Sequence, residues 1–359
     1  MPGVSATLER DAASAAELDA AVAAVEQSEE AWTAYISTQP RATGYHEWPW
    51  RNVFARAFGV EPMYISARRA GQIVGVLPTV LLDSWLFGRA LISLPYLNYG
   101  GVLADDHGVE RVLVEYALKI AREERCRHVE LRHVERHFED LPCKRHKVTM
   151  LLPLQPSAAL WNVVDRKVRN QVRKAQKSDL TYAAGGDQLL DQFYAVFARN
   201  MRDLGTPVYA RRFFAEMLAA FPDRARIHVV SLKTTPVAAG FTFETRGTVE
   251  IPWASSVRDF NALCPNHLLY WSILADAGDR GCATFDFGRS TPNEGTYKFK
   301  EQWGAQPVPL HWEYGLLDRD ALPDTGPTNP RFQLAVSVWK KLPLAVATRL
   351  GPFVVRAIP

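Results

Sequence analysis

The sequence predicts an α/β protein with two tandem domains, each a mixed central sheet flanked by helices. Its 359 residues exceed the ~100–200 residues of a typical domain. An internal repeat also divides the chain. Residues 63–77 and 228–242 each contain a short apolar strand, a polar turn and a second strand with a glycine, Gly75 or Gly240. Two such runs around a turn predict a β-hairpin in each half.

A second pair of segments extends this repeat. Residues 120–132 and 276–289 each contain a helix end, a cysteine (Cys126 or Cys282) and a strand with alternating apolar residues. One α/β unit of hairpin, strand, helix and strand therefore occurs twice. We expect a first domain over 1–153, a second over 154–318 and a tail over 319–359, because prolines mark the boundary between the copies.

The remaining elements follow from periodicity and capping. Helices are expected at 111–124, 161–177, 189–204 and 266–279, and a strand at 248–255. Gly205 is placed to end the third of these helices. The segment Thr291-Pro292-Asn293-Glu294 resembles a capping box with proline at the first helical position, and predicts a helix ending near Trp303.

Composition and charge exclude several classes of protein. No run of about 20 apolar residues predicts a membrane-spanning helix, and the acidic first 30 residues do not resemble a signal peptide. We therefore expect a cytoplasmic protein. Its four cysteines include no CxxC pair and are interpreted as buried thiols. Residues 126–146 are rich in histidine and cysteine, but their spacing fits no zinc motif, so no metal is expected.

Four segments carry a family resemblance: 166–177, 200–209, 285–290 and 295–305. They resemble the FemAB-like acyltransferases of the GNAT superfamily, and within them the subgroup found beside exopolysaccharide and exosortase (PEP-CTERM) systems. The resemblance covers most of the chain and is strongest from about 160 to 315. It implies two GNAT-like domains, with transfer of an acetyl or aminoacyl group to an amine in the second. The donor would be acyl-CoA or aminoacyl-tRNA, and no cofactor would be permanently bound.

One segment departs from the usual GNAT pattern. The donor pyrophosphate is expected at the N-terminus of the helix that begins near Asn266, where unpaired backbone N–H groups attract anions. The preceding residues 257–265 lack the glycines of the usual coenzyme A loop. This departure argues against ordinary acetyl-CoA binding.

The catalytic candidates lie between residues 285 and 303. By resemblance, Phe299 and Lys300 match a pair near the transfer site, and Lys300 would stabilise the oxyanion or an acceptor phosphate. Tyr297 shares its helix face with Lys300. Asp286 is a candidate general base. The alternatives are a solvated Lys300, a structural Asp286 and a Phe299 that belongs to the core.

Further residues are expected to bind substrate. Arg289 and Ser290 follow a strand and precede a helix, which is typical of an anion site. By resemblance, the acceptor pocket would be bordered by Asn200, Arg202 and Tyr209. Trp253 and Ser255, at the end of a central strand, would line the same cleft; the alternative for Trp253 is a place in the core.

Two basic segments need partners. Arg166, Arg169 and Arg173 lie on one side of a helix within a segment of net charge +4, and arginine suits bidentate phosphate contacts. The ligand would be a tRNA backbone, a nucleotide-sugar diphosphate or a lipid head group; a solvated face is the alternative. The basic amphipathic segment 331–356 either lies on an anionic membrane surface, the cytoplasmic face of the inner membrane, or packs onto the body of the protein.

The leading functional hypothesis is an amine acyltransferase that acts on an envelope or exopolysaccharide precursor. A non-catalytic scaffold that binds sugar-phosphate intermediates at a membrane is the alternative, because fold alone does not establish activity. A third possibility is an RNA-binding regulator, which predicts binding that weakens steeply with salt.

Overall fold

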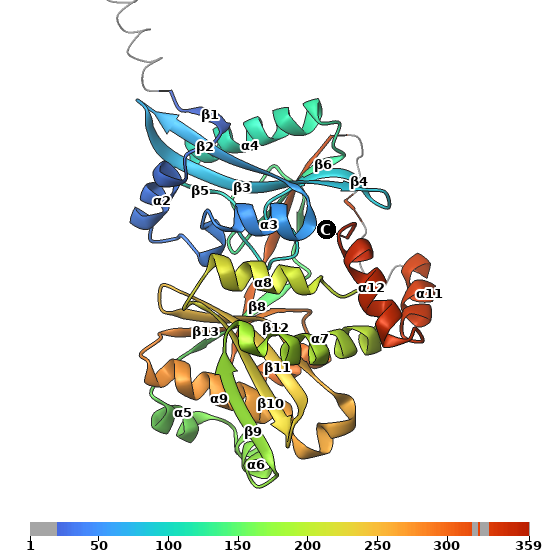
Figure 1. The fold of residues 1–359 in the computed structure, drawn as a ribbon. Helices are drawn as coiled ribbons and strands as arrows, with labels where there is room; N and C mark the ends of the chain where they lie inside the picture. The colour runs from blue at the N-terminus through green and yellow to red at the C-terminus, as the bar shows by residue number, and fades with distance from the viewer. Residues whose placement is uncertain (1–19, 318–321, 324–329, 359) are drawn as a thin grey trace, which may run out of the picture.

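A computed structural model describes residues 20–317, 322–323 and 330–358 and contains two mixed β-sheets, one above the other in Figure 1. The first unit has β1 (Val22–Val25), α2 (Glu29–Thr38), α3 (Trp50–Phe58), β2 (Glu61–Arg69), β3 (Gln72–Ser84), β4 (Gly88–Ile92), β5 (Leu103–Ala104), α4 (His107–Glu123), β6 (His128–His133) and β7 (Cys143–Lys144).

The second unit begins at β8 (Val148–Pro153) and continues through α5 (Ser157–Val163), α6 (Arg166–Gln176), β9 (Leu180–Gly185), α7 (Leu190–Leu204), α8 (Arg211–Ala220), β10 (Ala225–Leu232), β11 (Thr235–Thr245), β12 (Thr248–Ser256), α9 (Pro265–Asp279), β13 (Thr284–Ser290), α10 (Gly295–Glu301) and β14 (Gln306–Pro309). After it come β15 (His311–Leu316), α11 (Pro330–Trp339) and α12 (Leu344–Val355). Short 3-10 turns lie at Gly44–His46, Asp187–Leu189 and Arg258–Leu263.

The predicted repeat is present in both sheets, and the fold class is confirmed. Antiparallel hairpins β2–β3 and β10–β11 correspond, as do the parallel pairs β4–β6 and β12–β13. Helix α4 precedes β6 in the first copy, and α9 joins β12 to β13 in the second. A helix between two parallel strands is the usual crossover connection.

Each sheet contains one strand from beyond the predicted boundary at residues 153 and 154, so the two units exchange strands. The first sheet has the order β1-β2-β3-β4-β6-β15-β7, and the second has β14-β8-β13-β12-β11-β10-β9. Strand β15 follows the second unit in the chain but pairs with β6 and β7, while β8 pairs with β13 and β14. Sheet membership therefore does not follow the predicted division between residues 153 and 154.

Each sheet lies between helices, and the two units share one core. Helix α4 covers the outer face of the first sheet, and α5, α6 and α9 cover the outer face of the second. The facing sides are filled by α2, α3, α7 and α8, whose buried residues form a single cluster. Helix α3 contributes Trp50, Phe54 and Phe58, and α8 contributes Phe213, Phe214 and Met217. Figure 1 shows α3 and α8 side by side between the two sheets. Their aromatic packing fixes one unit against the other.

Several local predictions can be compared with the structure. Gly205 ends α7 with φ 78°, as expected. The predicted helix 161–177 is two helices, α5 and α6, because Asp165 caps the second through Lys167 N (2.6 Å). The capping box was wrong: Asn293 has φ 66°, so α10 begins only at Gly295 and ends at Glu301. Within the described ranges, no helix has the length and apolar character needed to cross a membrane.

Candidate active site

Two carboxyl groups lie together where β12 and β13 meet. Glu250 and Asp286 are the last register partners of these parallel strands, and their exposed fractions are 5% and 0%. Beyond them, β12 pairs with β11 and β13 pairs with β8. The carboxyl pair therefore lies at the point where the two strands separate.

Asp286 accepts three hydrogen bonds from three different parts of the fold. Its Oδ1 accepts from Thr149 Oγ1 of β8 (2.5 Å) and from Gly288 N (2.7 Å). Its Oδ2 accepts from the Tyr99 hydroxyl of the first unit (2.9 Å). Gly288 has φ 73°, a conformation that glycine adopts readily. Burial raises the pKa of Asp286, while these three donors stabilise its ionised form.

Glu250 is held by the first unit. Its Oε1 accepts from the Tyr45 hydroxyl (2.6 Å) and from Asn98 Nδ2 (2.5 Å). Burial and the nearby charge of Asp286 raise the pKa of Glu250 well above its ordinary value. We infer that the pair holds one proton at neutral pH, with the negative charge on Asp286, which has more donors.

Lys300 lies near both carboxyl groups, whose charges act on its pKa. Its Nζ donates to the carbonyl oxygens of Gly288 (2.9 Å) and Arg289 (3.0 Å), so it holds the end of β13 in place. Burial lowers the pKa of Lys300 to about 8. Its predicted neighbours on α10 turn away: Phe299 contacts the Tyr270 ring at 5.1 Å, and Tyr297 also packs against the core of the second unit. The core interpretation of Phe299 therefore fits its contacts.

A cluster of cations lies at the end of β13. Two guanidinium groups lie over the Trp312 ring, with Arg132 at 4.3 Å and Arg289 at 5.2 Å from its centroid. Arg132 donates to Glu130 (2.7 Å), whereas Arg289 forms no ion pair with any residue that the structure describes. Burial, with the charge of Arg132 as a further cause, lowers the pKa of Arg289 to about 10.

Unpartnered donors accompany Arg289. In the part of the chain that the structure describes, Ser290 Oγ and Trp312 Nε1 are buried and have no hydrogen-bond partner. Burial and the charge of Arg289 also lower the pKa of Lys147, whose Nζ donates to Thr291 Oγ1 (2.7 Å). A buried donor without an acceptor is costly, so this group of donors suits an anion.

The predicted acceptor residues are brought together in part. Asn200 Nδ2 donates to Ser255 Oγ (3.0 Å), and the rings of Tyr209 and Trp253 pack at 6.2 Å. Arg202 lies elsewhere, because its guanidinium binds Asp203 and the carbonyl of Leu342 in the tail. Tyr209 and Trp253 also belong to the core that joins the two units.

The basic helix lies far from the carboxyl pair. Figure 1 shows α6 at the end of the second unit opposite the first. Its buried side packs on α9, while Arg166 and Arg173 are exposed and Arg169 is half-buried. Cys264 Sγ donates to Gln171 Oε1 (2.6 Å), which connects α6 to the start of α9. There Asn266 has a buried Oδ1 with no partner among the described residues.

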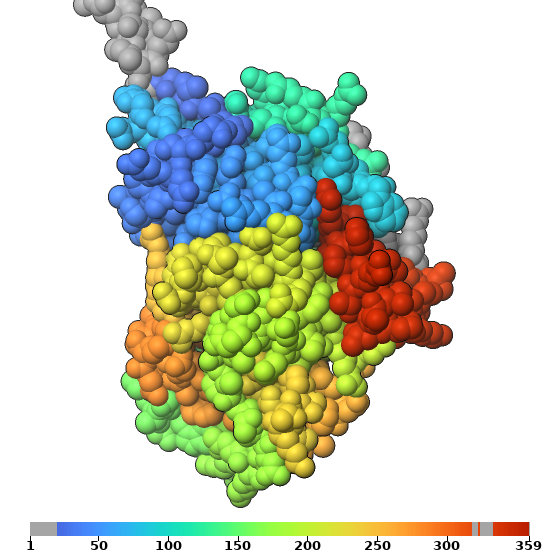
Figure 2. All heavy atoms as spheres, in the orientation of Figure 1, coloured from blue at the N-terminus to red at the C-terminus, as the bar shows by residue number. Residues whose placement is uncertain are grey.

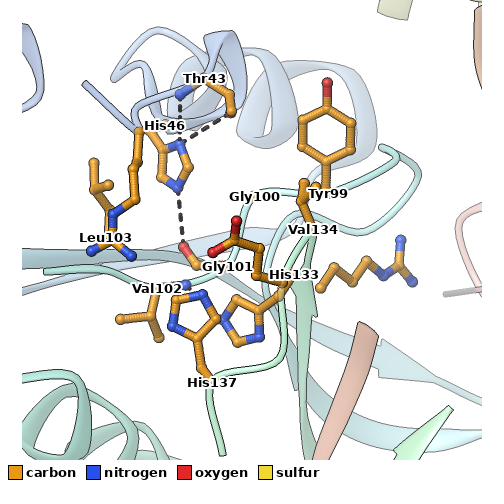
Figure 3. A pocket seen from close by; sticks show the side chains of 13 residues that line it. Thr43, His46, Tyr99, Gly100, Gly101, Val102, Leu103, His133, Val134 and His137 are labelled. Atoms are coloured by element: carbon orange, nitrogen blue, oxygen red, sulfur yellow. Dashed lines mark hydrogen bonds between the residues drawn. The ribbon is translucent and has the colours of Figure 1, made fainter. Parts of the chain in front are cut away.

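A cavity of about 270 Å³ opens beside Tyr99 in the first unit. Figure 3 shows the side chains of its walls, which include His46, His133, His137 and the loop Gly100–Leu103. His46 accepts from Thr43 N and donates to the Gly101 carbonyl (3.2 Å). Burial lowers the pKa of His46 to about 4, so it is neutral. Tyr99 lines the cavity and donates to Asp286, so it links the cavity to the carboxyl pair.

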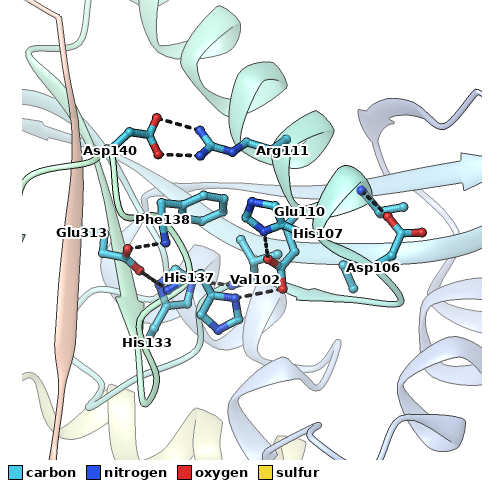
Figure 4. Close-up of polar contacts among 12 residues, drawn as sticks. Val102, Asp106, His107, Glu110, Arg111, His133, His137, Phe138, Asp140 and Glu313 are labelled. Atoms are coloured by element: carbon cyan, nitrogen blue, oxygen red, sulfur yellow. Dashed lines mark hydrogen bonds and ion pairs between the residues drawn. The ribbon is translucent and has the colours of Figure 1, made fainter.

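Two histidines of the segment 126–146 contact carboxylates. His133 Nδ1 lies 2.7 Å from Glu313 Oε2, and His137 Nδ1 lies 2.9 Å from Glu110 Oε1 (Figure 4). Glu313 also accepts from the backbone of Phe138 (2.7 Å). No group of three or more histidine, cysteine or acidic side chains in the described ranges is arranged to hold a metal ion.

Sequence reasoning missed Glu250 and the two tyrosines that donate to the carboxyl pair. Glu250 carried a usable signal, since it lies between Val249 and Ile251 of a predicted strand, and a carboxylate there needs a partner. Tyr45 and Tyr99 carried no such signal. Their hydrogen bonds join residues 205 and 187 positions apart in the chain.

Comparison with known proteins identifies the domain. Residues 164–301 match the acetyltransferase (GNAT) domain family, and no curated protein matches the chain. Several solved structures are similar in fold. FemX is 14% identical, with a TM-score of 0.63 over 88% of this chain and 99% of its own. The C-terminal domain (DUF2156) of a putative lysylphosphatidylglycerol synthetase from Agrobacterium fabrum is 12% identical, with a TM-score of 0.55 over 86% of this chain and 96% of its own.

A tandem GNAT protein from the clavulanic acid biosynthesis pathway is 13% identical, with a TM-score of 0.52 over 82% of this chain and 97% of its own. At these identities the likeness concerns the fold, and it agrees with the two repeated units seen here. Residues 164–301 therefore match the acetyltransferase (GNAT) domain family, and the fold around them is similar to that of a tandem GNAT protein.

Proposed function

We propose that the chain transfers an acyl or aminoacyl group to the amine of a phosphate-bearing envelope or exopolysaccharide precursor. The observation that carries this proposal is the buried pair of Glu250 and Asp286 at the point where β12 and β13 separate. Both units supply donors that hold the pair, Tyr45 and Tyr99 from the first and Thr149 from the second. A base fixed between two units suits a reaction in which donor and acceptor must meet in one orientation.

The proton balance of the reaction assigns a role to the pair. The amine nitrogen attacks the carbonyl carbon of the donor ester or thioester, and the C–N bond forms as the bond to the leaving oxygen or sulfur breaks. The amine loses one proton, which Asp286 accepts through the Tyr99 hydroxyl (2.9 Å), and the leaving group takes one proton back. The protonated Glu250 keeps a second charge out of the site.

The cations beside β13 support a phosphate-bearing substrate. Arg289 offers its guanidinium without a competing carboxylate among the described residues, and Ser290 Oγ and Trp312 Nε1 are further donors. A planar guanidinium binds phosphate oxygens in pairs. The resemblance of the four sequence segments supports an acceptor from exopolysaccharide or envelope chemistry. It also supports a place for this chain in the PEP-CTERM-associated subgroup.

Two donors fit different features of the second unit. Aminoacyl-tRNA fits the exposed arginines of α6 and the missing glycine loop before α9. Acyl-CoA fits the GNAT domain and the start of α9 at Asn266. Both donors present an acyl carbonyl to the same amine, so the carboxyl pair serves either one.

A transfer assay tests the proposal. Purified protein is incubated with a series of acyl-CoAs or with charged tRNA, together with an amino-sugar nucleotide as acceptor. Product mass and release of free thiol or of deacylated tRNA are followed. We expect transfer from one donor class, and a rate at least about 100-fold lower in Asp286→Asn. Arg289→Gln should raise KM for the phosphate-bearing acceptor more than for the same amine without phosphate.

The control is Glu301→Gln, an exposed carboxylate on α10, which should keep the full rate. An Asp286→Asn variant as active as the wild type would remove Asp286 from the mechanism. Binding of the sugar phosphate without transfer from any donor would support the scaffold instead.

A further inference from the structure

One surface of the molecule exposes an unusual amount of apolar side chain. Of the eleven large apolar residues exposed in the described ranges, six lie on α11 and α12 and two in the turn between β3 and β4. Trp85 of that turn is 79% exposed and Phe353 of α12 is 74% exposed. We call these eight residues the tail surface: Trp85, Leu86, Leu334, Val338, Leu344, Val346, Leu350 and Phe353.

The turn and the two helices lie side by side. Ser84 Oγ donates to the carbonyl of Ala357 (2.6 Å), and the Tyr96 hydroxyl donates to the carbonyl of Arg356 (3.0 Å). These bonds hold the base of the β3–β4 turn against the end of α12. Figure 2 shows the tail helices, in red, on the same flank as the end of the β3–β4 hairpin.

The tail is fixed to the body by its other face. Ala347, Gly351 and Val355 are buried at intervals of four residues along α12, and Gly351 lies directly on Val208. On α11, Val336 packs against Gly205 at the end of α7. The helices therefore use one face to join the body, and the apolar residues of the tail surface lie on the faces left uncovered.

The charge around these residues favours an anionic partner. Residues 330–359 contain five lysines or arginines and no acidic residue. Lys340, Lys341 and Arg349 are exposed beside the apolar residues. Asp83, next to the turn, lies 3.6 Å from the guanidinium of Arg89, which offsets its negative charge. A second copy of this chain would present the same positive charge and would be repelled.

We propose that the tail surface docks on an anionic lipid bilayer. Apolar side chains that project between basic ones match the boundary between lipid head groups and acyl chains. An exposed tryptophan is typical of side chains that lie at that boundary. Docking there holds both units at the membrane by a surface that is separate from the carboxyl pair, so this inference does not depend on the proposed reaction.

Vesicle flotation tests the inference with the full chain. Vesicles of phosphatidylglycerol mixed with phosphatidylcholine are compared with vesicles of phosphatidylcholine alone. We expect the wild type to float with the anionic vesicles, and less so as salt is added. The double variant Trp85→Ser/Phe353→Ser should bind at least ~10-fold more weakly. Lys340→Gln/Lys341→Gln/Arg349→Gln should lose the preference for anionic lipid.

Val163→Ser on α5 is the matched control, because Val163 is 67% exposed and lies outside the tail surface. It should bind vesicles as the wild type does, and all variants should keep the circular dichroism of the wild type. Absence of flotation, or equal flotation of the double variant, would overturn the inference. So would sedimentation analysis showing that the same surface joins two copies in solution while vesicles bind nothing.

Discussion

At the scale of residues, the site is defined by the unequal environments of two neighbouring carboxyl groups. Asp286 accepts from Thr149, Gly288 and Tyr99, whereas the described contacts of Glu250 converge on one oxygen. Two carboxylates cannot both be ionised in a buried site at low cost. The group with more donors therefore carries the charge, and the other holds the proton.

Because one carboxyl group is protonated and the other is ionised, we expect substitution by an amide to be tolerated at Glu250 and costly at Asp286. Glu250→Gln keeps the accepting oxygen and replaces the protonated one with a donor, so the free energy of unfolding should change by less than about 1 kcal/mol. Asp286→Asn directs an NH₂ group at existing donors and should cost about 1–3 kcal/mol. Urea unfolding at pH 7 measures both. Equal losses would contradict the assignment of the proton to Glu250.

The lowered pKa of the buried Lys300 should make the free energy of unfolding depend on pH. Burial lowers its pKa from 10.5 to about 8, so the unfolded chain binds the proton more tightly than the folded chain. The cost of burying the charge is complete below pH 8, at about 3 kcal/mol, and disappears as the pH rises to 10.5. The unfolding free energy of the wild type should therefore rise over this window relative to that of Lys300→Met.

The measurement is urea unfolding of both proteins at pH 7.5 and pH 10, because the other titrating groups cancel in the difference. Lys298→Met, which replaces an exposed lysine on the same helix, is the control. A difference between wild type and Lys300→Met that stays constant with pH would show that Lys300 does not lose its charge in this range.

The sequence located one strand of the site and missed the other. Asp286, Arg289 and Lys300 belong to a single segment, so a local pattern can identify them together. Glu250, Tyr45 and Tyr99 reach the site only through sheet register and the packing of the two units. Those relations depend on contacts between distant residues, which one sequence does not specify.

At the scale of elements, helix interiors could be predicted and helix ends less well. Apolar periodicity located α7 and α9 to within a residue or two. The start of α10 was missed because Asn293 adopts a left-handed backbone, which no capping pattern reveals. The break between α5 and α6 depends on Asp165, which is an N-cap in the middle of an otherwise continuous helical pattern.

We expect the arginines of α6 to make a salt-dependent contact with the donor, and this contact can be removed without unfolding the protein. Its buried side is Val168, Val172 and Ala175, so substitution of Arg166, Arg169 and Arg173 by glutamine should leave the melting temperature within a few degrees of the wild type. If the donor is tRNA, its affinity should fall, and the slope of log affinity against log salt should decrease by about 2–3.

Fluorescence anisotropy of labelled tRNA across a salt series measures this slope. Substitution of three exposed arginines elsewhere, Arg122, Arg211 and Arg212, is the control for loss of overall charge. If both triple variants lose the same affinity, α6 makes no specific contact with tRNA.

At the scale of the whole molecule, the tandem architecture was predictable but the exchange of strands was not. The repeat of hairpin, helix and strand identifies two units, whereas Pro153 gave only a boundary in sequence. Strand β8 lies before that boundary but pairs with β13 in the second sheet, and β15 lies after it but pairs with β6 in the first. Neither strand differs in composition from one that would pair within its own unit, so periodicity cannot reveal the exchange.

The exchange predicts that the two units unfold together. In the first sheet, Glu313 of β15 is completely buried and accepts from His133 and from the backbone of Phe138. A chain that ends at residue 310 would leave these donors unpaired and expose an edge of β6, so it should lose the first unit although residues 20–146 are all present. A chain that ends at residue 329 keeps β15 and should remain folded. Calorimetry of the wild type should show one transition with equal calorimetric and van't Hoff enthalpies. Two separate transitions, or slow hydrogen exchange in β2 and β3 of the chain ending at residue 310, would mean that the first unit folds without its exchanged strand.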